Sequence, residues 1–349
     1  MMLVNRTNLL KIALWSVPAF VIIVLILSIE AYRIIYAPNL KTPPTGDSVF
    51  YVATGTSFEA LCEQLNSENR LVKEGSFRLL ARRMKFRTAR PGRYLLQEGM
   101  SNLDLIRMFR SGAQTPLRVT FNNIRNTESL AAVLARQLEP DSAAFADLFS
   151  DTAVMRDRGF SPETFPALFI PNTYEFFWNT SPEQFLDRIL REYEDFWTPL
   201  RKQKADSLGL TPLEVSTLAS IVEEETKKND EKKRVAGVYL NRLSKGIPLQ
   251  ADPTVKFALG DPGLRRILHK HLSYKSPYNT YLNPGLPPGP ICFPEISSLD
   301  AVLFAENHTF YFFCAREDFS GYHNFATTLS EHNKNARAYH AALTKAGIQ

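Results

Sequence analysis

The sequence has few cysteines and lacks the common metal, nucleotide and nucleophile motifs. Its three cysteines, Cys62, Cys292 and Cys314, are too few and too scattered for a zinc site or a disulfide framework. The histidines never adopt a metal-ligand spacing such as HExxH, and GxSxG, phosphate-loop and dinucleotide motifs are missing. We therefore expect no metal and no cofactor. Cys292 and Cys314 could form a disulfide outside the cytoplasm, or could be buried as free thiols.

Charge is missing from one long stretch near the N-terminus. Residues 12–29 form an 18-residue run without a charged side chain, and a helix of that length reaches about 27 Å. Residues 31–36 can extend it, and no small-x-small cleavage site follows, which favours an uncleaved anchor over residues 12–36 against a cleaved signal peptide. Because basic residues precede the run without an acid, residues 1–11 are predicted to be a cytoplasmic tail and the later chain extracytoplasmic, on a single-pass inner-membrane protein.

A short polar segment and a small duplicated domain are predicted next. Residues 37–48 are rich in proline and polar residues, which predicts a linker. Within the domain predicted over residues 49–117, residues 52–65 align with residues 96–109. Each copy predicts a strand, a glycine turn, a serine N-cap and an amphipathic helix. Two unrelated strand-turn-helix units would give the same pattern.

Most of the basic charge lies in this domain. From Arg70 to Arg118 there are twelve Lys and Arg against three acidic residues, a net of +9, so the rest of the chain sums to −4 of the total +5. Such a patch often binds nucleic acid. The predicted location and the missing helix-turn-helix spacing argue against nucleic acid. Anionic lipid head groups, an acidic partner or a merely solvated face are the alternatives.

A well-marked helix start occurs at Thr211. Thr211 can act as N-cap, Pro212 fits the first helical position, and Glu214 completes a capping box. At about 100° per residue one face of this helix is apolar. Its members are Val215, Leu218, Ile221 and Val222.

Glu225 falls at the end of that apolar face. Partial desolvation there raises the pKa of a carboxyl group and suits it to act as a general acid. Glu223 and Glu224 are predicted to point toward solvent or the flank. The alternative is that the whole charged run is a solvated, charge-paired helix end.

Seven ordered words spread over about a hundred residues resemble the signature of the endolytic murein transglycosylase family, membrane-anchored lytic enzymes that cut peptidoglycan glycan strands. The words are ASIVEEET (219–226), VYLNRL (238–243), LQADPTV (249–255), YNTY (278–281), GLPPGPI (285–291), HNF (323–325) and HN (332–333). In that family the catalytic glutamate directly precedes the threonine of the first word, which is Glu225 here. The family usually has aspartate where this chain has Asn172, so Asn172 is not counted as catalytic.

The resemblance also implies a fold and a set of substrate contacts. The fold class is α+β: a transmembrane helix, a LysM-like glycan-binding domain, and a mixed α and β catalytic domain over residues 118–349. The implied substrate-binding residues are Glu223, Asn241, Arg242, Gln250, Asp252, Thr254, Tyr278, Asn279, Tyr281, His323 and Asn333. The implied partners are peptidoglycan strands and the cell-wall synthases (penicillin-binding proteins) that make them.

Several of these residues have a structural alternative. Asp252 before Pro253 is also a standard helix opening, so it could be an N-cap. Residues 274–294 contain six prolines and are predicted to form a stiff loop. Its tyrosines can stack on sugar rings or pack the loop against the domain. Asn229 or Asp230 is predicted to cap the next helix, which stops at Gly246.

The resemblance implies a reaction that needs one carboxylate. The acid protonates the glycosidic oxygen between N-acetylmuramic acid and N-acetylglucosamine, and the C6 hydroxyl closes on C1 to give a 1,6-anhydro end. Cleavage within nascent strands would terminate their elongation. A hydrolytic muramidase, which would need a second carboxylate, and a catalytically silent scaffold for the synthases are the alternatives.

Overall fold

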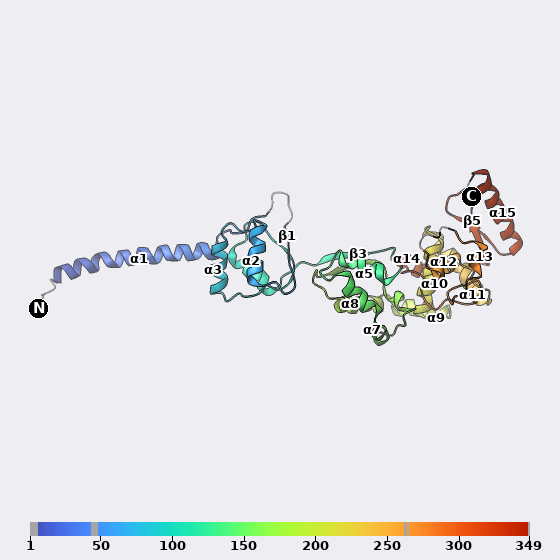
Figure 1. Ribbon diagram of the computed structural model, residues 1–349, viewed down its shortest axis with the longest axis horizontal. Coiled ribbons are helices and arrows are strands. Elements are labelled where there is room, and N and C mark those ends of the chain that lie inside the picture. The colour runs from blue at the N-terminus through green and yellow to red at the C-terminus, as the bar shows by residue number, and fades with distance from the viewer. Residues whose placement is uncertain (1–5, 43–47, 262–263, 265, 348–349) are drawn as a thin grey trace. The chain divides into compact units, whose positions relative to one another are not determined.

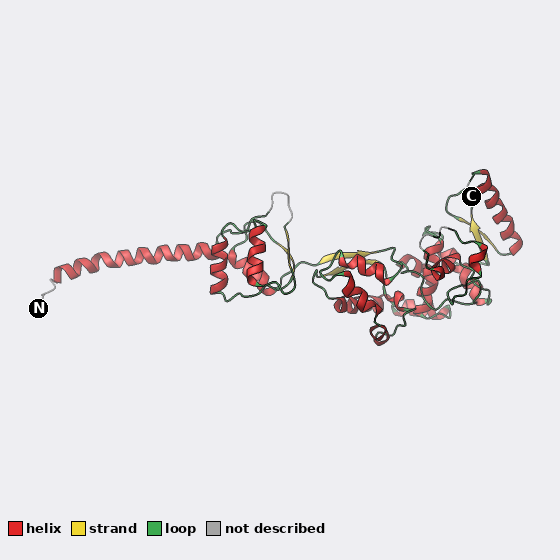
Figure 2. Ribbon diagram, in the orientation of Figure 1, coloured by secondary structure: helices red, strands yellow, loops and turns green. Residues whose placement is uncertain are grey.

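The structure is a computed structural model that describes residues 6–42, 48–261, 264 and 266–347 (Figure 1). The predictions for residues 1–5 and 43–47 lie outside the described residues. The chain divides into two compact units: unit 1 comprises Met1–Leu117 with Glu175–Asn179, and unit 2 comprises Arg118–Tyr174 with Thr180–Gln349. The predicted mixture of helices and strands is confirmed, with helices dominating and strands confined to two-stranded sheets (Figure 2).

Unit 1 begins with a long apolar helix. Within α1, residues Ser16–Tyr36 are long and apolar enough to cross a membrane, since 21 residues span about 32 Å. Pro18 lies inside the helix, as membrane helices tolerate. The elements of this unit are α1 (Arg6–Tyr36), β1 (Val49–Val52), α2 (Phe58–Ser67), α3 (Glu74–Arg83), β2 (Gly92–Leu95) and α4 (Asn102–Ser111).

The internal duplication predicted from the sequence is visible in unit 1. Each copy is a strand, a glycine turn with positive φ (Gly55 +82°, Gly99 +79°), and a helix. Ser57 and Ser101 are the N-caps of α2 and α4, and each accepts a hydrogen bond from a backbone N–H of its own helix. The two strands pair antiparallel in one sheet. The strand-turn-helix plan is thus confirmed, and the LysM-like assignment stays a prediction.

The described part of the predicted linker, residues 37–42, is packed into unit 1. Leu40 is buried, and Asn39 donates to Oδ1 of Asn102 at 2.6 Å. Short bridges join Pro38 to Ser101 and Leu40 to Leu71. No flexible spacer therefore separates α1 from the fold in these residues.

Unit 2 is mainly helical, and the predicted strand at Arg118–Phe121 and helix near residues 129–138 are both present. The elements from residue 117 onward are β3 (Leu117–Phe121), α5 (Thr127–Ala135), α6 (Ser142–Ser150), α7 (Thr152–Asp157), η1 (Phe165–Leu168), β4 (Asn172–Phe176), α8 (Pro182–Phe196), α9 (Pro199–Ser207), α10 (Pro212–Glu225), α11 (Lys232–Ser244), α12 (Asp252–Leu259), α13 (His269–Leu272), α14 (Ile296–Leu303), β5 (Phe312–Ala315), β6 (His323–Ala326) and α15 (Leu329–Lys345). β3 pairs with β4, and β5 pairs with β6 in antiparallel register.

Helix α10 runs through the core of unit 2. Its start is as predicted: Thr211 is the N-cap, Pro212 is the first helical residue, and the side chains of Thr211 and Glu214 form a capping box. The prediction of one apolar face was too narrow, since every side chain from Val215 to Glu223 is buried. The hydroxyls of Ser216, Thr217 and Ser220 bond back to carbonyls of the helix itself, as in the 2.7 Å bond from the Ser220 hydroxyl to the Thr217 carbonyl. A helix covered by α11 and α14 has no solvent face over these turns.

Two further predictions concern the segments around α11 and before α14. Neither Asn229 nor Asp230 caps α11, because the helix starts at Lys232 with Glu231 at the N-cap and no side-chain cap bond. The proline-rich loop is confirmed: residues 274–294 contain neither helix nor strand.

A candidate active site at the end of helix α10

Glu225 is the last residue of α10 and is half-buried. The hydroxyl of Tyr239 on α11 donates to its Oε1 at 2.6 Å. The pKa of Glu225 is raised from 4.5 to about 7, chiefly because burial disfavours the charged form. The Tyr239 hydrogen bond lowers this pKa, while the charges of Asp252 and Glu224 raise it. A carboxyl group with a pKa near 7 can give and take a proton at neutral pH.

Glu225 lines two cavities that meet at the end of α10. The first, of about 450 Å³, also receives side chains from α11, α12, β5, β6 and α15. The second, of about 700 Å³, is bounded by Asp252 and Lys256 of α12, Arg266, and His340 of α15. Glu225 and Asp252 belong to both. The first cavity is lined by Glu225, Val238, Tyr239, Arg242, Leu249, Gln250, Asp252, Tyr281, Tyr311, Phe312, Phe313, Cys314, Ala315, His323 and His332.

Asp252 and Tyr281 form one polar pair in these walls. The Tyr281 hydroxyl donates to Oδ1 of Asp252 at 2.6 Å, and burial together with this bond raises the pKa of the phenol, so that Tyr281 stays a donor. The N-cap alternative for Asp252 is wrong, because Ala251 is the N-cap and Asp252 is the first residue of α12. Its carboxylate is therefore directed to the cavity wall and not to its own helix.

Arg242 and Gln250 form a second pair. Arg242 is buried, donates to Oε1 of Gln250 at 2.7 Å and to the Tyr311 carbonyl at 2.8 Å, and both residues line the first cavity. Gln250 has φ of +53°, a conformation that is uncommon outside glycine. Such a backbone outlier in a cavity wall marks a place where the fold holds a side chain against its local preference.

His323 is held in the cavity wall by a carboxylate. Glu231 is buried and accepts from the backbone N–H of His323 at 2.9 Å, and its other oxygen lies 2.7 Å from Nδ1 of His323. This two-point contact fixes the ring, with Phe313 packed edge-on at 5.3 Å. His332 stacks on Phe312 in the same cavity, and burial together with the charge of Arg242 lowers its pKa.

Besides Glu223, five predicted contacts lie away from these walls. Thr254 and Asn279 are fully buried, Thr254 against Thr280 at 2.9 Å and Asn279 as a donor to the carbonyls of Leu272 and Tyr274. Asn241 donates to the carbonyls of His308 and Phe310. The ring of Tyr278 packs on that of Phe257, with 4.7 Å between the ring centres. Asn333 is an exposed side chain on α15. The first three are therefore structural polar groups, which a word match cannot distinguish from ligand contacts.

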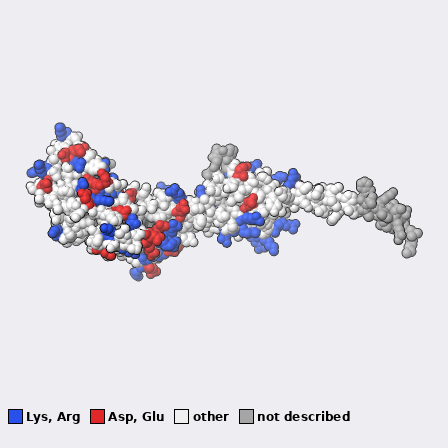
Figure 3. Space-filling view, turned by 180° about the vertical axis from the view of Figure 1, so that it is seen from behind, with Lys and Arg blue, Asp and Glu red and all other residues white. Residues whose placement is uncertain are grey.

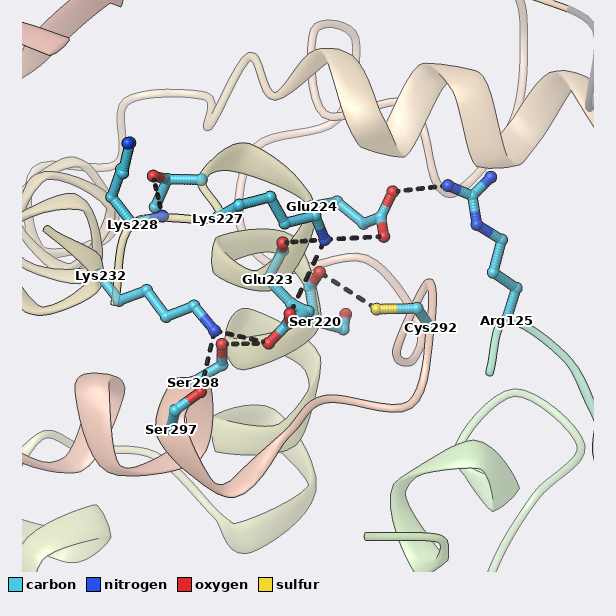
Figure 4. A network of polar contacts seen from close by, with 11 residues as sticks. Arg125, Ser220, Glu223, Glu224, Lys227, Lys228, Lys232, Cys292, Ser297 and Ser298 are labelled. Carbon is cyan, nitrogen blue, oxygen red and sulfur yellow. Dashed lines mark hydrogen bonds and ion pairs between the residues drawn. The ribbon is translucent and has the colours of Figure 1, made fainter. Parts of the chain in front are cut away.

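Glu223 is not solvated as predicted but buried (Figure 4). Its Oε2 accepts from Nζ of Lys232 at 2.9 Å and from the hydroxyl of Ser298 at 2.5 Å. Burial alone would raise the pKa of Glu223, but these hydrogen bonds outweigh it and the pKa is lowered. Glu223 thus ties α10 to α11 and α14 and lines neither of the cavities beside Glu225. Glu224 is partly exposed and pairs with Arg125 at 3.2 Å, as the flank prediction allowed.

Sequence reasoning missed three residues of the site: Tyr239, Glu231 and His332. Tyr239 stands in the word VYLNRL between Val238 and Leu240, and only its hydroxyl hints at a polar role. The cysteines are free: Cys292 is buried, and Cys314 lies in the wall of the first cavity, so the suggested disulfide is wrong. Among the described residues no cluster of His, Cys, Asp or Glu could hold a metal ion.

Comparison with known proteins adds relatives that cover most of the chain. The profile of the YceG-like family matches residues 50–338. A protein of Bacillus subtilis (strain 168) named endolytic murein transglycosylase is 28% identical over 332 residues, covering 87% of this chain and 89% of the relative. A protein of the same name from Streptococcus pneumoniae serotype 2 (strain D39) is 28% identical over 308 residues, or 78% of this chain and 55% of the relative. The crystal structure of a YceG-like protein from Listeria monocytogenes is similar with a TM-score of 0.54 and 26% identity, covering 82% of this chain and 98% of that one.

Proposed function

This chain belongs to the YceG-like family, and from that premise we propose that it is an endolytic lytic transglycosylase that cuts peptidoglycan strands with Glu225 as its acid and base. The observation that carries the proposal is the position of Glu225, half-buried with a pKa of about 7 at the meeting point of two cavities. The relatives named endolytic murein transglycosylase support the same reaction class.

The proposed step needs only one proton carrier. Protonated Glu225 gives its proton to the glycosidic oxygen as the bond from C1 of N-acetylmuramic acid to that oxygen breaks. The resulting carboxylate takes the proton of the C6 hydroxyl of the same sugar, and O6 bonds to C1. Glu225 is then protonated again, and the product ends in 1,6-anhydro-N-acetylmuramic acid. Holding the C6 hydroxyl and C1 in one bound sugar makes the ring closure intramolecular, which favours it over attack by water.

The two cavities support cleavage inside a strand. Because Glu225 and Asp252 line both, sugars on each side of the cut bond have space next to the acid. Tyr281 and His323 are the proposed substrate contacts in the first cavity, where Tyr239 sets the proton affinity of the acid. Arg242 holds the wall through its bonds to Gln250 and Tyr311.

The proposed setting is the outer face of the cytoplasmic membrane. Helix α1 can span a bilayer, and the basic residues before its apolar run favour a cytoplasmic N-terminus. The duplicated unit supports, within the same proposal, a LysM-like role in glycan binding. Cutting nascent strands beside the membrane would terminate their elongation by the synthases. A reporter fused after Gln349 should be active only outside the cytoplasm.

The deciding experiment is mass analysis of the products made from purified, uncrosslinked glycan strands by the full chain in detergent. Anhydro ends on internal fragments are expected, and Glu225→Gln should lower the rate by at least about a hundredfold, since general acid and base help is worth about 10² to 10⁴. Glu306→Gln, a matched change in an exposed pair with Arg234, should keep the wild-type rate. Reducing ends would show a muramidase, and no product from the wild type would favour the silent scaffold.

A further inference from the structure

We infer that unit 1 has a membrane-docking face, and that this face binds the anionic phospholipid head groups of the bilayer that α1 crosses. The membrane-docking face is the outward side of α3 with its flanking residues: Val72, Lys73, Leu79, Arg82, Arg83 and Lys85. The inference does not rest on the proposed reaction.

The first step is that the rest of unit 1 follows α1 without a spacer in residues 37–42. Ile34 and Ile35, in the last turn of α1, pack against the core of unit 1. The side chain of Asn102, at the start of α4, donates to the Ile34 carbonyl at 2.8 Å. The candidate span ends at Tyr36, and its full length is needed to cross about 30 Å of hydrocarbon. The part of unit 1 that follows α1 must therefore lie at the head groups.

The interface level is also marked on α1 itself. Tyr32 and Tyr36 are exposed and their rings lie 5.1 Å apart, and tyrosines gather where membrane meets water. Glu30 and Arg33 form an exposed pair one turn away. Charges and aromatic rings thus begin at the same turns where the helix enters unit 1.

The second step is the orientation of α3. Figure 1 shows α3 at the edge of unit 1 that α1 enters, and the two helices are in contact. Phe77 and Leu80 of α3 are buried in the core, so the opposite side of the helix faces outward. Ser76 accepts a hydrogen bond from the same Asn102 that bonds to α1. The outward side of α3 therefore faces the region through which α1 passes.

The third step is the chemistry of this side. Leu79 and Val72 are 46% and 48% exposed, and Arg82 and Arg83 are exposed as well. Among the described residues no carboxylate pairs with Arg82, Arg83 or Lys85, whereas Glu74 is held by Arg78. Figure 3 shows Lys and Arg gathered along one edge of unit 1, some of them next to α1. Unpaired basic groups can bind lipid phosphates, and the exposed aliphatic side chains among them can contact the outermost part of the acyl chains. A head-group layer offers both kinds of contact.

Other partners fit this side less well. A nucleic-acid or soluble polyanion site needs approach from bulk solvent, and the bilayer around α1 occupies that approach. A folded acidic protein would have to displace head groups from the same place. The continuity of the face with the span thus favours the lipid already present.

The test uses the full chain in nanodiscs of phosphatidylcholine alone or of an equal mixture with phosphatidylglycerol. Hydrogen-deuterium exchange of residues 72–85 should be about three- to tenfold slower in the anionic discs, because each basic residue near an anionic surface favours the docked state. Raising the salt to about 1 M should remove the difference, since the Debye length falls to about 3 Å. Exchange in α2, which has no part in the face, should be the same in both discs.

Charge reversal supplies the matched control. Arg82→Glu with Arg83→Glu should abolish the lipid-dependent difference. Arg90→Glu with Arg93→Glu changes the net charge equally near β2, whose partner β1 Figure 1 places at the end of unit 1 away from α1, and should preserve it. Equal exchange of residues 72–85 in both discs would overturn the inference, as would equal sensitivity to the two reversals. Protection caused by added polyglutamate in neutral discs, but not by anionic lipid, would assign the face to an acidic partner instead.

Discussion

The hydroxyl of Tyr239 and the carboxyl group of Glu225 are joined by a hydrogen bond of 2.6 Å between α10 and α11. Burial places the pKa of Tyr239 well above its usual value, so the phenol stays protonated and donates. It therefore stabilises the ionised form of Glu225 and offsets part of the effect of burial on the acid. Without this bond Glu225 would hold its proton more tightly.

Tyr239→Phe should move the pH dependence of cleavage. The general acid must be protonated in the free enzyme, so kcat/KM should fall above a pH of about 7 in the wild type. Loss of the hydrogen bond raises the pKa of Glu225, and the midpoint of this fall should shift upward by about one pH unit. Tyr174→Phe is the matched control, because that hydroxyl bonds to the Ile170 carbonyl outside both cavities. A profile unchanged in Tyr239→Phe would mean that another group limits the rate.

Asp252→Asn should shift the same midpoint in the opposite direction. The negative charge of Asp252 raises the pKa of Glu225, so its removal lowers that pKa and moves the alkaline fall of kcat/KM to lower pH. Asparagine can still accept from Tyr281, which keeps the local geometry. Asp300→Asn, in a surface pair with Arg201, should leave the midpoint in place. An upward shift in Asp252→Asn would contradict the electrostatic role given to this residue.

Glu223→Gln should destabilise the fold. It leaves Lys232 buried without its charge partner, a change that typically costs about 3–5 kcal/mol of unfolding free energy. Adding Lys232→Met removes the second charge and should recover most of that loss. Glu224→Gln, next along the helix but paired with exposed Arg125, should cost less than about 1 kcal/mol. Denaturant unfolding of the wild type and these three variants measures the unfolding free energies. Equal losses for Glu223→Gln and Glu224→Gln would contradict the prediction.

Glu225→Gln should stabilise the protein at alkaline pH. Between pH 4.5 and about pH 7 the folded state holds a proton on Glu225 that the unfolded state has lost. The unfolding free energy therefore falls as pH rises through this window. Glutamine carries no such penalty. One pKa unit is worth about 1.4 kcal/mol, and partial exposure reduces the effect, so the variant should gain about 1–2 kcal/mol relative to the wild type from about pH 4 to pH 8. A stability difference independent of pH would show that the carboxyl group is not shifted.

Local rules were sufficient where the chain interacts with itself over a few residues. The capping box at Thr211, the serine caps of the duplicated unit and the proline-rich loop all depend on neighbours in sequence, and all are present. Asp252 shows the limit of the same rules. An Asp-Pro pair can occupy the N-cap and the first helical position, or the first and second helical positions. The second arrangement frees its carboxylate for the cavity.

Glu223 shows what a helical wheel cannot predict. Its bonds reach Lys232, nine residues away, and Ser298, seventy-five residues away. A helical wheel of α10 alone shows one apolar face, and the opposite side is then predicted to face water. Two more helices pack there, and only the tertiary structure shows that a charged side chain can be buried with its partner. Tyr239 was missed for the same reason, since its hydroxyl meets Glu225 only when α10 and α11 pack together.

The two sides of the first cavity differ in how they should fluctuate. Glu225 closes a helix whose side chains are buried from Val215 to Glu223, and the amides of such a helix exchange only when much of the domain opens. Another part of the wall comes from β5, with every residue half-buried, and α15, with no buried side chain among its residues. Few apolar contacts hold it, so it should open locally at a lower free energy. Under the proposed function, the acid would keep a fixed position while a glycan entered by moving the wall formed by β5 and α15, and entry would set a rate separate from that of the proton transfer.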